Sequence, residues 1–454
     1  MIGVVLALVI QVAGAQEARN ISLDQALAMS ADGNAENRIA EWEVVRARAV
    51  RDQMAANYFP KVTAEAAILH WDDELLLDFS GGGGGTGTTD CTALPPPFDA
   101  MCSSFSEPSV IREQDTENYS VTVVQPITGL YAIYEGHKAT RHLARASGHD
   151  EAATRERVRH QVVQAYFGAL ELDELAAVAG QATSSLEAHV ARARAFHEAG
   201  LLLKSDLLQL EVALANARIG ESRAQDGVVL ARRRLALLTG AEGPVAPTPV
   251  EPGRVRSSDS FDELDAVSLA EERTDAQAMA ERVAAARAGR RAKRADLFPQ
   301  IAALASWQRN EGQGSFAPPE AWYVGLSAQW QLFGGGQKHF AIREATAQLR
   351  MAEEGFAALQ QGIALEAEAA LREVDASARA FEAANQTIEQ AEENLRLVQA
   401  RFDSQLASAS DLLDAETLAA KARADHITSW YDHLVAVAAA QRALGEVVDP
   451  LEAH

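Results

Sequence analysis

Two patterns of hydrophobic and polar residues alternate along this chain, one typical of helices and the other typical of strands. Two long segments, about 131–199 and 337–404, carry Ala, Leu and Val at helical spacing with charged residues between them. A helix of ~65 residues would be roughly 100 Å long, since each residue adds 1.5 Å. A short break at Gly200 or Gln405 follows each segment, and a second helical pattern begins after it. The pattern therefore predicts two long helical hairpins, each with its tip at the break.

A pair of short alternating runs precedes each long helical segment. In each half of the chain a helical stretch ends at a Phe-Pro pair, Phe59-Pro60 or Phe298-Pro299, because the residue before proline disfavours the helical region. The runs that follow carry apolar residues on one face and mainly Ser, Thr, Gln or Gly on the other. We therefore predict a β-hairpin with one apolar and one polar face in each half. The four expected strands are about 60–70, 118–127, 299–308 and 322–332.

The two halves of the chain match each other at a constant spacing. Ser205-Asp206-Leu207-Leu208 recurs 205 residues later as Ser410-Asp411-Leu412-Leu413, and Gly240 recurs at the same spacing as Gly445. The two Phe-Pro pairs are 239 residues apart, so the first half contains 34 additional residues. The sequence thus predicts a tandem duplication with an insertion in the first copy.

Two repeats are expected between short terminal segments. Residues Gly3 to Val12 are almost wholly apolar, and Ala13-Gly14-Ala15 is a small-x-small cleavage site, which is typical of a signal peptide. Four prolines between the copies indicate an extended linker. The expected segments are a signal peptide (1–15), a first repeat (16–240) with an insertion (about 72–116) and a helical hairpin (about 131–239), a proline-rich linker (241–262), a second repeat (263–445) with a helical hairpin (about 337–444), and a C-terminal tail (446–454).

Charge and hydropathy exclude two classes of protein. The chain has 41 Lys and Arg against 64 Asp and Glu, a formal net charge of −23, so it lacks the basic composition that a nucleic-acid partner requires. Beyond residue 15, no apolar run approaches the ~20 residues of a membrane-spanning helix, whereas alternating barrel strands would leave little hydropathy signal. The two cysteines, Cys91 and Cys102, lie in the insertion, and an oxidising compartment would allow them to form a disulfide.

The predicted strands and helices together indicate a duct built from more than one chain. Four strands cannot close a transmembrane barrel, because such barrels need about eight strands or more and open edges are not tolerated in lipid. At least two chains are therefore required. The polar face of the strands would line a water-filled lumen, and the long helices would continue it as a tube.

The sequence as a whole resembles the TolC-like outer-membrane efflux protein family. The residues that carry the resemblance are the two Phe-Pro pairs, the strand end at Leu326–Gly336, the two hairpin tips and the terminal Gln441–Gly445. The resemblance implies a mostly α-helical protein with a membrane β-barrel, assembled as a homotrimer. Its twelve-strand barrel, four strands per chain, would lie in the lipid of the outer membrane above a periplasmic α-helical barrel. It also implies an exit duct without enzymatic activity or cofactor, whose partners are a periplasmic adaptor and an inner-membrane transporter of the RND, ABC or MFS type.

The resemblance assigns roles to residues of the two tips. Contacts with the adaptor are expected at Gly200, Leu201, Ser205, Gln405, Leu406 and Ser410. Asp411 and Asp414 match an acidic pair that lines the periplasmic entrance in relatives, and Asp206 is a further candidate for the pore constriction. All three acids also lie near a helix start, where each would stabilise the helix dipole by ~0.3–1 kcal/mol. Both interpretations stay open, and Asp206 is expected to begin its helix in the same way as Asp411.

The second tip departs from the family pattern in two ways. Gln405 occupies the position that Gly200 has in the first tip, which leaves the geometry of that turn open. Phe402 and Ala407 occupy positions where some relatives carry Tyr and Arg. The polar locks that close the tip in such relatives are therefore not implied for this chain.

Three functions stay open from the sequence. They are an efflux duct for small molecules, an exit duct for type I protein secretion, and a periplasmic adaptor or coiled-coil structural protein. An adaptor normally has one helical hairpin inserted in a β-domain, whereas each of the two hairpins here follows a strand pair. No nucleotide site is expected, because the glycine-rich segment Gly81–Gly87 lacks the lysine of a phosphate loop. No metal site is expected either, because the chain has no His-Glu-x-x-His pair and His137, His142 and His149 do not share one helix face at metal-ligand spacing. Basic residues between Arg287 and Arg294 are candidates for contact with lipid phosphates.

Overall fold

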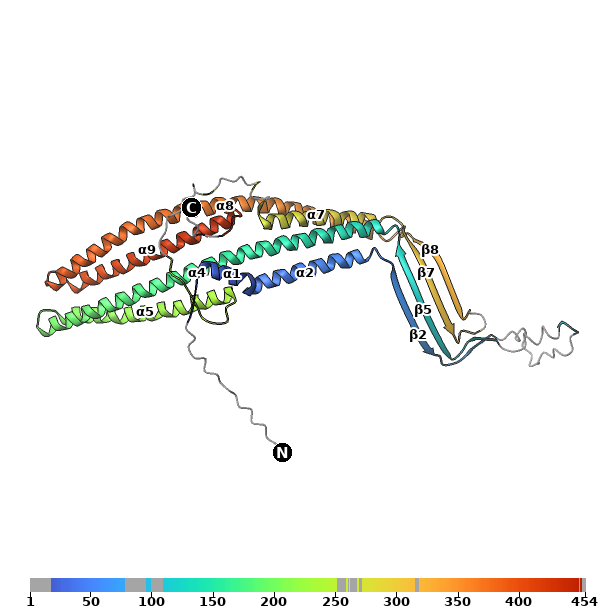
Figure 1. Ribbon diagram of the computed structural model, residues 1–454, viewed down its shortest axis with the longest axis horizontal. Coiled ribbons are helices and arrows are strands. Elements are labelled where there is room, and N and C mark those ends of the chain that lie inside the picture. Colours follow the sequence, from blue (N-terminus) through green and yellow to red (C-terminus); the bar gives the residue numbers. More distant parts are fainter. Residues whose placement is uncertain are drawn as a thin grey trace, which may run out of the picture. The chain divides into compact units, whose positions relative to one another are not determined.

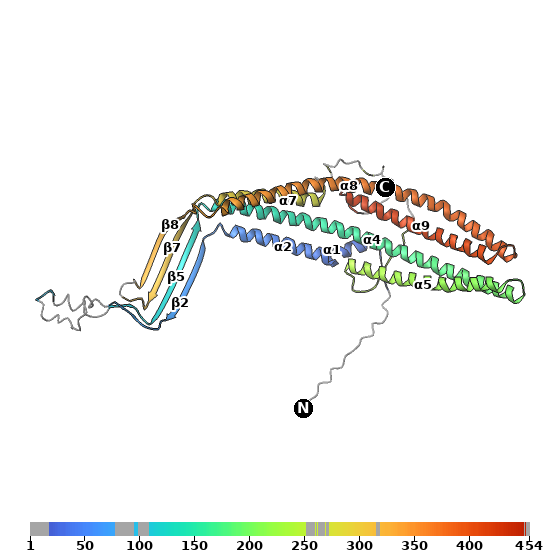
Figure 2. The same cartoon turned by 180° about the vertical axis from the view of Figure 1, so that it is seen from behind.

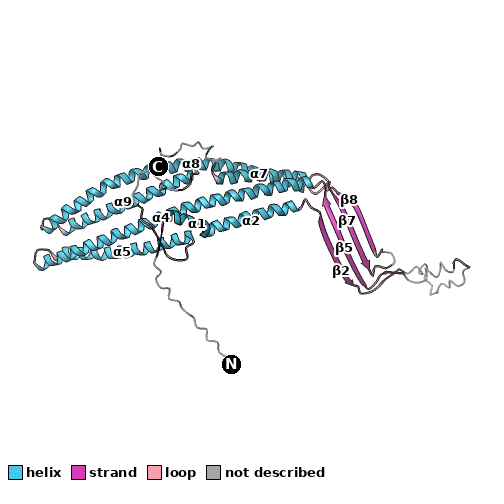
Figure 3. Ribbon diagram, in the orientation of Figure 1, coloured by secondary structure: helices cyan, strands magenta, loops and turns pink. Residues whose placement is uncertain are grey.

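The computed structural model describes residues 18–77, 95–98, 109–250, 259, 261, 268, 272–314, 318–448 and 450. Most of these residues are helical, and a smaller number form strands (Figure 3). The chain divides into two compact units, which we call the helical unit (residues 1–47, 144–282 and 352–454) and the strand unit (48–143 and 283–351). The expected signal peptide, and Cys91 and Cys102 with their expected disulfide, lie outside the described residues.

The strand unit contains a four-stranded antiparallel sheet. Its strands are β2 (Lys61–His70), β5 (Asp115–Pro126), β7 (Gln300–Glu311) and β8 (Glu320–Gln329). They lie in the order β2-β5-β7-β8, so β5 of the first half of the chain pairs with β7 of the second half (Figure 1). Among the described strands, β2 and β8 each have a partner on one side only. The sheet therefore has two open edges.

The insertion of the first half begins and ends with paired strands. β3 (Leu75–Leu77) and β4 (Ser109–Arg112) form a short antiparallel ladder. The guanidinium of Arg112 lies 3.8 Å from the ring centroid of Trp71, a cation–π contact. The indole Nε1 of Trp71 donates a hydrogen bond to Thr116 Oγ1 of β5 at 3.0 Å. These contacts connect the base of the insertion to the sheet.

Four helices adjoin the sheet along the chain, and each belongs partly to the strand unit and partly to the helical unit. α2 (Ala35–Ala56) and α7 (Thr274–Ala295) both end a few residues before a Phe-Pro pair, because proline stops a helix at the preceding residues. α4 (Leu130–Glu198) begins soon after β5, and α8 (Gln337–Asp403) begins soon after β8. Each strand pair is thus entered from one helix and left by another.

The helical unit consists mainly of two helical hairpins. α5 (Lys204–Thr239) returns along α4, and α9 (Ala409–Ala443) returns along α8, as both views of the chain show (Figure 1, Figure 2). Alanine has the highest helix propensity of all residues, and its frequency in these segments favours long uninterrupted helices. α1 (Leu23–Gly33) begins with a capping box, in which Ser22 and Gln25 satisfy each other's backbone N–H groups.

A buried aromatic cluster forms the largest core of the helical unit. Tyr166 and Phe167 of α4 are fully buried, and the rings of Phe167 and Tyr431 of α9 lie 6.2 Å apart. The hydroxyl of Tyr166 donates to the carbonyl of Thr248 at 2.9 Å, so this buried polar group has a partner. Two strands, β1 (Arg19–Ile21) and β6 (Val245–Pro247), pair in parallel and contribute Ile21 and Val245 to the same core. Part of the expected proline-rich linker is therefore a buried strand.

Candidate functional site

The pairing register gives the sheet one apolar face that extends across all four strands. Residues directly opposite each other on antiparallel strands share a face. Two adjacent rows of this face are Ala64, Val121, Trp307 and Trp322, and Val62, Val123, Ala305 and Val324. Leu326 lies on the same face and is 74% exposed. The described residues therefore leave this apolar face open.

The opposite face of the sheet is polar. Thr63, Thr122, Ser306 and Tyr323 form one row across it. The hydroxyl oxygens of Thr122 and Ser306 lie 3.1 Å apart and share a hydrogen bond between β5 and β7. The sheet thus separates polar from apolar side chains, as expected from the alternating runs in the sequence.

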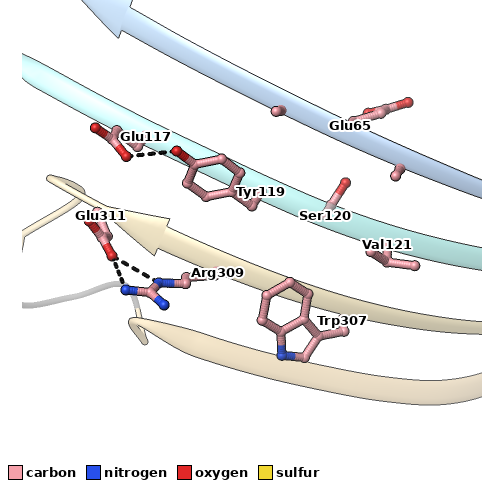
Figure 4. A pocket seen from close by; sticks show the side chains of 10 residues that line it. Glu65, Glu117, Tyr119, Ser120, Val121, Trp307, Arg309 and Glu311 are labelled. Atoms are coloured by element: carbon pink, nitrogen blue, oxygen red, sulfur yellow. Dashed lines mark hydrogen bonds and ion pairs between the residues drawn. The ribbon is translucent and has the colours of Figure 1, made fainter.

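Aromatic and charged side chains gather near the end of the sheet where β7 ends. Figure 4 shows Tyr119, Trp307, Arg309 and Glu311 on neighbouring strands around a cavity of about 660 Å³. The hydroxyl of Tyr119 donates to Glu117 Oε2 at 2.9 Å, and Arg309 Nε donates to Glu311 Oε1 at 2.8 Å. Aromatic rings with bonded polar tips beside an apolar face are typical of a membrane–water interface.

The tip of the first hairpin turns at a glycine in the left-handed conformation. Gly200 has φ of +75°, a region that glycine adopts without steric strain. Its N–H donates to the carbonyl of His197 at 2.9 Å, and the N–H of Leu201 donates to that of Phe196 at 2.8 Å. These two bonds form a Schellman motif, which ends α4.

The tip of the second hairpin has the same geometry although glycine is absent. Gln405 has φ of +63°, and its N–H donates to the carbonyl of Phe402 at 2.9 Å. The N–H of Leu406 donates to the carbonyl of Arg401 at 2.8 Å. The turn that the sequence left open is therefore a Schellman motif as well. A residue with a Cβ in this conformation carries roughly 1–2 kcal/mol of strain.

The two returning helices begin differently. Ser408 is the N-cap of α9, and its N–H and Oγ donate to Asp411 Oδ2 at 2.9 and 2.8 Å. Both hydrogen bonds favour the ionised carboxylate and lower the pKa of Asp411, and the bond from the backbone N–H has the larger effect. α5 has Leu203 as its N-cap and no side-chain hydrogen bond there. Asp206 and Asp411 are each the third residue of their helix, as expected from the repeat, but only Asp411 takes part in a capping box, because leucine has no hydroxyl to complete one.

The other residues predicted at the tips lie on the surface of the hairpin ends. Asp411 and Asp414 are exposed, and their separation by three positions on α9 puts them on one helix face. Asp206 is half-buried, with its carboxylate 3.3 Å from Ser205 Oγ. Besides Gly200 and Gln405, four residues were predicted to contact an adaptor, and all four are exposed: Leu201, Ser205, Leu406 and Ser410.

An exposed ion pair joins the two hairpins beside their tips. Arg192 Nη1 of α4 donates to both carboxylate oxygens of Asp403, the last residue of α8, at 2.6 and 2.8 Å. Both side chains are 45% exposed. An ion pair in such an environment typically contributes ~0–1 kcal/mol to stability.

A buried polar cluster joins the same hairpins farther from the tips. His189 Nε2 of α4 lies 2.7 Å from Glu416 Oε1 of α9, and Gln399 Nε2 of α8 donates to the same oxygen at 3.1 Å. The side chains of His189 and Glu416 are only 3% and 7% exposed. Val190 of α4 and Leu412 of α9, which neighbour them on their helices, belong to an apolar core to which α4, α5, α8 and α9 all contribute. One carboxylate therefore connects α4, α8 and α9 within an apolar core.

Sequence reasoning missed both contacts between the hairpins. A signal existed for the buried cluster, since His189 follows Leu186 by three positions on an apolar helix face and precedes Val190. Its partner, Glu416, lies 227 residues away, so no local spacing could identify it. Only the packing of the two hairpins brings the residues together.

None of the helices in the described residues combines the length and apolar character that crossing a bilayer requires. The same part of the chain contains no group of three His, Cys, Asp or Glu side chains placed to hold a metal ion.

Comparison with known proteins identifies the second half of the chain. Residues 266–446 contain α7, the strands β7 and β8, and the second hairpin, and they match the family model described as outer membrane efflux protein. This region is an outer membrane efflux protein domain. The resemblance to TolC-like channels noted in the sequence is thereby confirmed. No curated protein matches the chain.

Solved structures share the fold of the efflux protein domain and of the half that precedes it. The outer-membrane channel CmeC of Campylobacter jejuni has a TM-score of 0.76 at 14% identity and covers 95% of this chain and 87% of its own. A membrane protein from Pseudomonas aeruginosa has a TM-score of 0.75 at 21% identity and covers 93% of both chains. VceC of Vibrio cholerae, an outer membrane protein, has a TM-score of 0.73 at 16% identity and covers 94% and 97%. The chain thus has the mostly helical fold of these outer-membrane channels, and the family that residues 266–446 match consists of channel proteins.

Proposed function

We propose that three copies of this chain form a duct in the bacterial outer membrane, through which small molecules leave the cell. The observation that carries the proposal is the four-stranded sheet with one apolar face, one polar face and two open edges. The membership of residues 266–446 in the outer membrane efflux protein family supports it.

The open edges of β2 and β8 favour assembly with further copies. Backbone N–H and C=O groups along an edge strand each need a hydrogen-bond partner, and an unpaired group in lipid costs several kcal/mol. Pairing of β8 with β2 of a neighbouring copy would satisfy both edges. Cyclic symmetry would close the sheet into a barrel with no edge at all.

The width required of a duct favours three copies over two. Two copies would supply eight strands, and an eight-stranded barrel is filled by its own side chains. Three copies would supply twelve strands and leave a lumen lined by the polar face. The resulting homotrimer is the assembly that the resemblance to TolC-like channels implies.

The strand lengths fit the thickness of the membrane. The four strands of the sheet have 10 to 12 residues. At ~3.3 Å per residue and a tilt of about 40°, they would span roughly 25–30 Å of bilayer. Lipid would then cover the open apolar face that includes Leu326.

The hairpin tips would serve as the periplasmic entrance and as the docking site of a periplasmic adaptor. Leu201 and Leu406 are exposed at equivalent positions of the two tips, and exposed apolar residues of this kind are suited to contact another protein. The adaptor would connect the duct to an inner-membrane transporter, which completes a tripartite efflux pump. Asp411 and Asp414 of three chains would place six carboxylates around the entrance, with Asp206 nearby.

The test uses two neighbouring residues of β8 that lie on opposite faces of the sheet. Leu326→Arg places a charge on the apolar face, where it would cost about 2–4 kcal/mol near the middle of the bilayer. Ser327→Arg places the same charge on the polar face, opposite Ala302 of β7. Membrane fractions of cells that express each variant are extracted in mild detergent, and the mass and the conductance in planar bilayers are measured.

We expect the unmodified chain and the Ser327→Arg variant to purify as trimers that form pores, with a changed conductance in the variant. The Leu326→Arg variant should fail to assemble in the membrane. A stable folded monomer in the membrane, or equal behaviour of the two variants, would show that the sheet does not form a trimeric barrel with this orientation.

A further inference from the structure

A cavity of about 390 Å³ lies at the junction of α7, β7, β8 and α8 in the strand unit. We call it the junction pocket. Its lining contains two lysines, four glutamines, one acid, one aromatic residue and one alanine: Lys293, Lys338, Gln300, Gln329, Gln331, Gln337, Asp296, Phe298 and Ala341. A cavity of this volume accommodates a small organic molecule.

The junction pocket belongs to the polar side of the sheet. Gln300 and Gln329 are paired between β7 and β8, and they are followed on the same face by the pair Ala302 and Ser327. This is the face that carries Ser306 and its hydrogen bond to Thr122. In the proposed duct, which this inference takes as its starting point, the pocket would therefore open toward the lumen.

The positive charges of the junction pocket are not neutralised by close partners. Among the described residues, neither Lys293 nor Lys338 has an ion-pair partner. Asp296 is the single acid in the lining, so the pocket has an excess of one positive charge. This contrasts with the whole chain, whose net charge is −23. A local cationic pocket in an acidic protein attracts anions to a defined position.

The equivalent junction in the first half of the chain lacks these features. At the spacings that relate the two halves, Lys293 corresponds to Met54 and Lys338 to Ile133. Ala341 corresponds to Gly136, and Met54 Sδ lies 3.5 Å from the place that a Cβ on Gly136 would take. Methionine and glycine thus pack together at the first junction, whereas the second has a polar cavity. The lysines are therefore not required to form a junction of this type.

We propose that the junction pocket binds a small organic acid, with its carboxylate or phosphate between Lys293 and Lys338. Glutamine amides can donate to its remaining oxygens, and Asp296 can accept from a hydroxyl or ammonium group of the same molecule. In a trimer, three such pockets would surround the lumen. Organic anions present in the lumen would then be held there transiently.

The experiment measures binding of radiolabelled citrate to the detergent-purified protein by equilibrium dialysis. The test variant is Lys293→Met combined with Lys338→Ile, which introduces the residues of the first half. The matched control is Lys421→Met, because Lys421 is an exposed lysine of α9 that lies outside the pocket. We expect the unmodified protein and the control to bind citrate equally, and the double variant to bind at least tenfold more weakly.

Equal citrate binding by all three proteins, or an equal loss in the control, would overturn the proposal. A second measurement determines lipid phosphorus in organic extracts of the same preparations, since a lipid headgroup offers the same phosphate chemistry. Lipid retained by the unmodified protein and lost from the double variant would overturn the assignment to a soluble acid. Dialysis does not depend on conduction, so the binding result is independent of whether the chain forms pores.

Discussion

Replacing Gln405 by glycine is expected to stabilise the second hairpin tip and to weaken its contact with an adaptor. Gln405 adopts φ of +63° and makes the same backbone hydrogen bonds as Gly200 in the first tip. The glutamine side chain contributes strain to the turn without contributing to its hydrogen bonds. A strained residue retained at an exposed tip is consistent with a binding role for that side chain.

The magnitude follows from two opposing terms. Relief of the left-handed strain stabilises the tip by roughly 1–2 kcal/mol. Glycine also gives the unfolded chain more freedom, which destabilises by about 0.4–1 kcal/mol. The net stabilisation of the Gln405→Gly variant is therefore about 0.5–1 kcal/mol. Local opening of the tip should become about two- to fivefold rarer.

Hydrogen exchange of tip amides, followed by mass spectrometry on the intact protein, measures this opening directly. The reverse change, Gly200→Gln, is a matched control, because a Cβ at Gly200 would meet no atom within 4 Å and only backbone strain would be added. Exchange should slow at the second tip in Gln405→Gly and accelerate at the first tip in Gly200→Gln. Faster or unchanged exchange around residue 405 in the glycine variant would refute the claim that Gln405 strains the turn. Unchanged affinity of this variant for the adaptor would refute the claim that the Gln405 side chain binds the adaptor.

Three further predictions concern the helical unit. Neutralising the proposed entrance with Asp411→Asn and Asp414→Asn should reduce cation selectivity and block by trivalent cations in single-channel recordings, whereas a pure helix-start role leaves both unchanged. Burial and the neighbouring Arg442 lower the pKa of His160 to about 4, so stability should be intact above pH ~6.5 and fall as the pH decreases toward 4. In thermal unfolding, the His160→Gln variant should lose less stability between pH ~6.5 and 4 than the unmodified protein. The difference in unfolding free energy should be on the order of 1–2 kcal/mol, because solvent partly screens the ring. Glu416→Ala should destabilise by about 3 kcal/mol in denaturant unfolding, because it leaves His189 unpaired in an apolar core, and a loss below ~1 kcal/mol would contradict the buried pair.

The amino-acid sequence by itself determined the local elements of this protein. Helical spacing of Ala and Leu over about 65 residues leaves no alternative to a long helix. Strict alternation in strands such as Val324–Leu326 assigns each side chain to a face, since successive residues of a strand point in opposite directions. Gly200 marks a helix end, because glycine adopts the left-handed conformation without strain. These signals depend only on residues that are close in sequence.

The tertiary structure decided the features that depend on residues far apart in the chain. The pairing of β5 with β7 joins the two halves into one sheet, and no spacing within either half indicates it. The contact of His189 with Glu416 and the meeting of Lys293 with Lys338 in one pocket likewise require packed helices or strands. Gln405 shows the limit most clearly. The sequence suggests that its turn could differ from the turn at Gly200. In the structure, two backbone hydrogen bonds end α8 and stabilise the same left-handed conformation at Gln405. The free energy of these bonds and of the hairpin packing outweighs the strain of one Cβ.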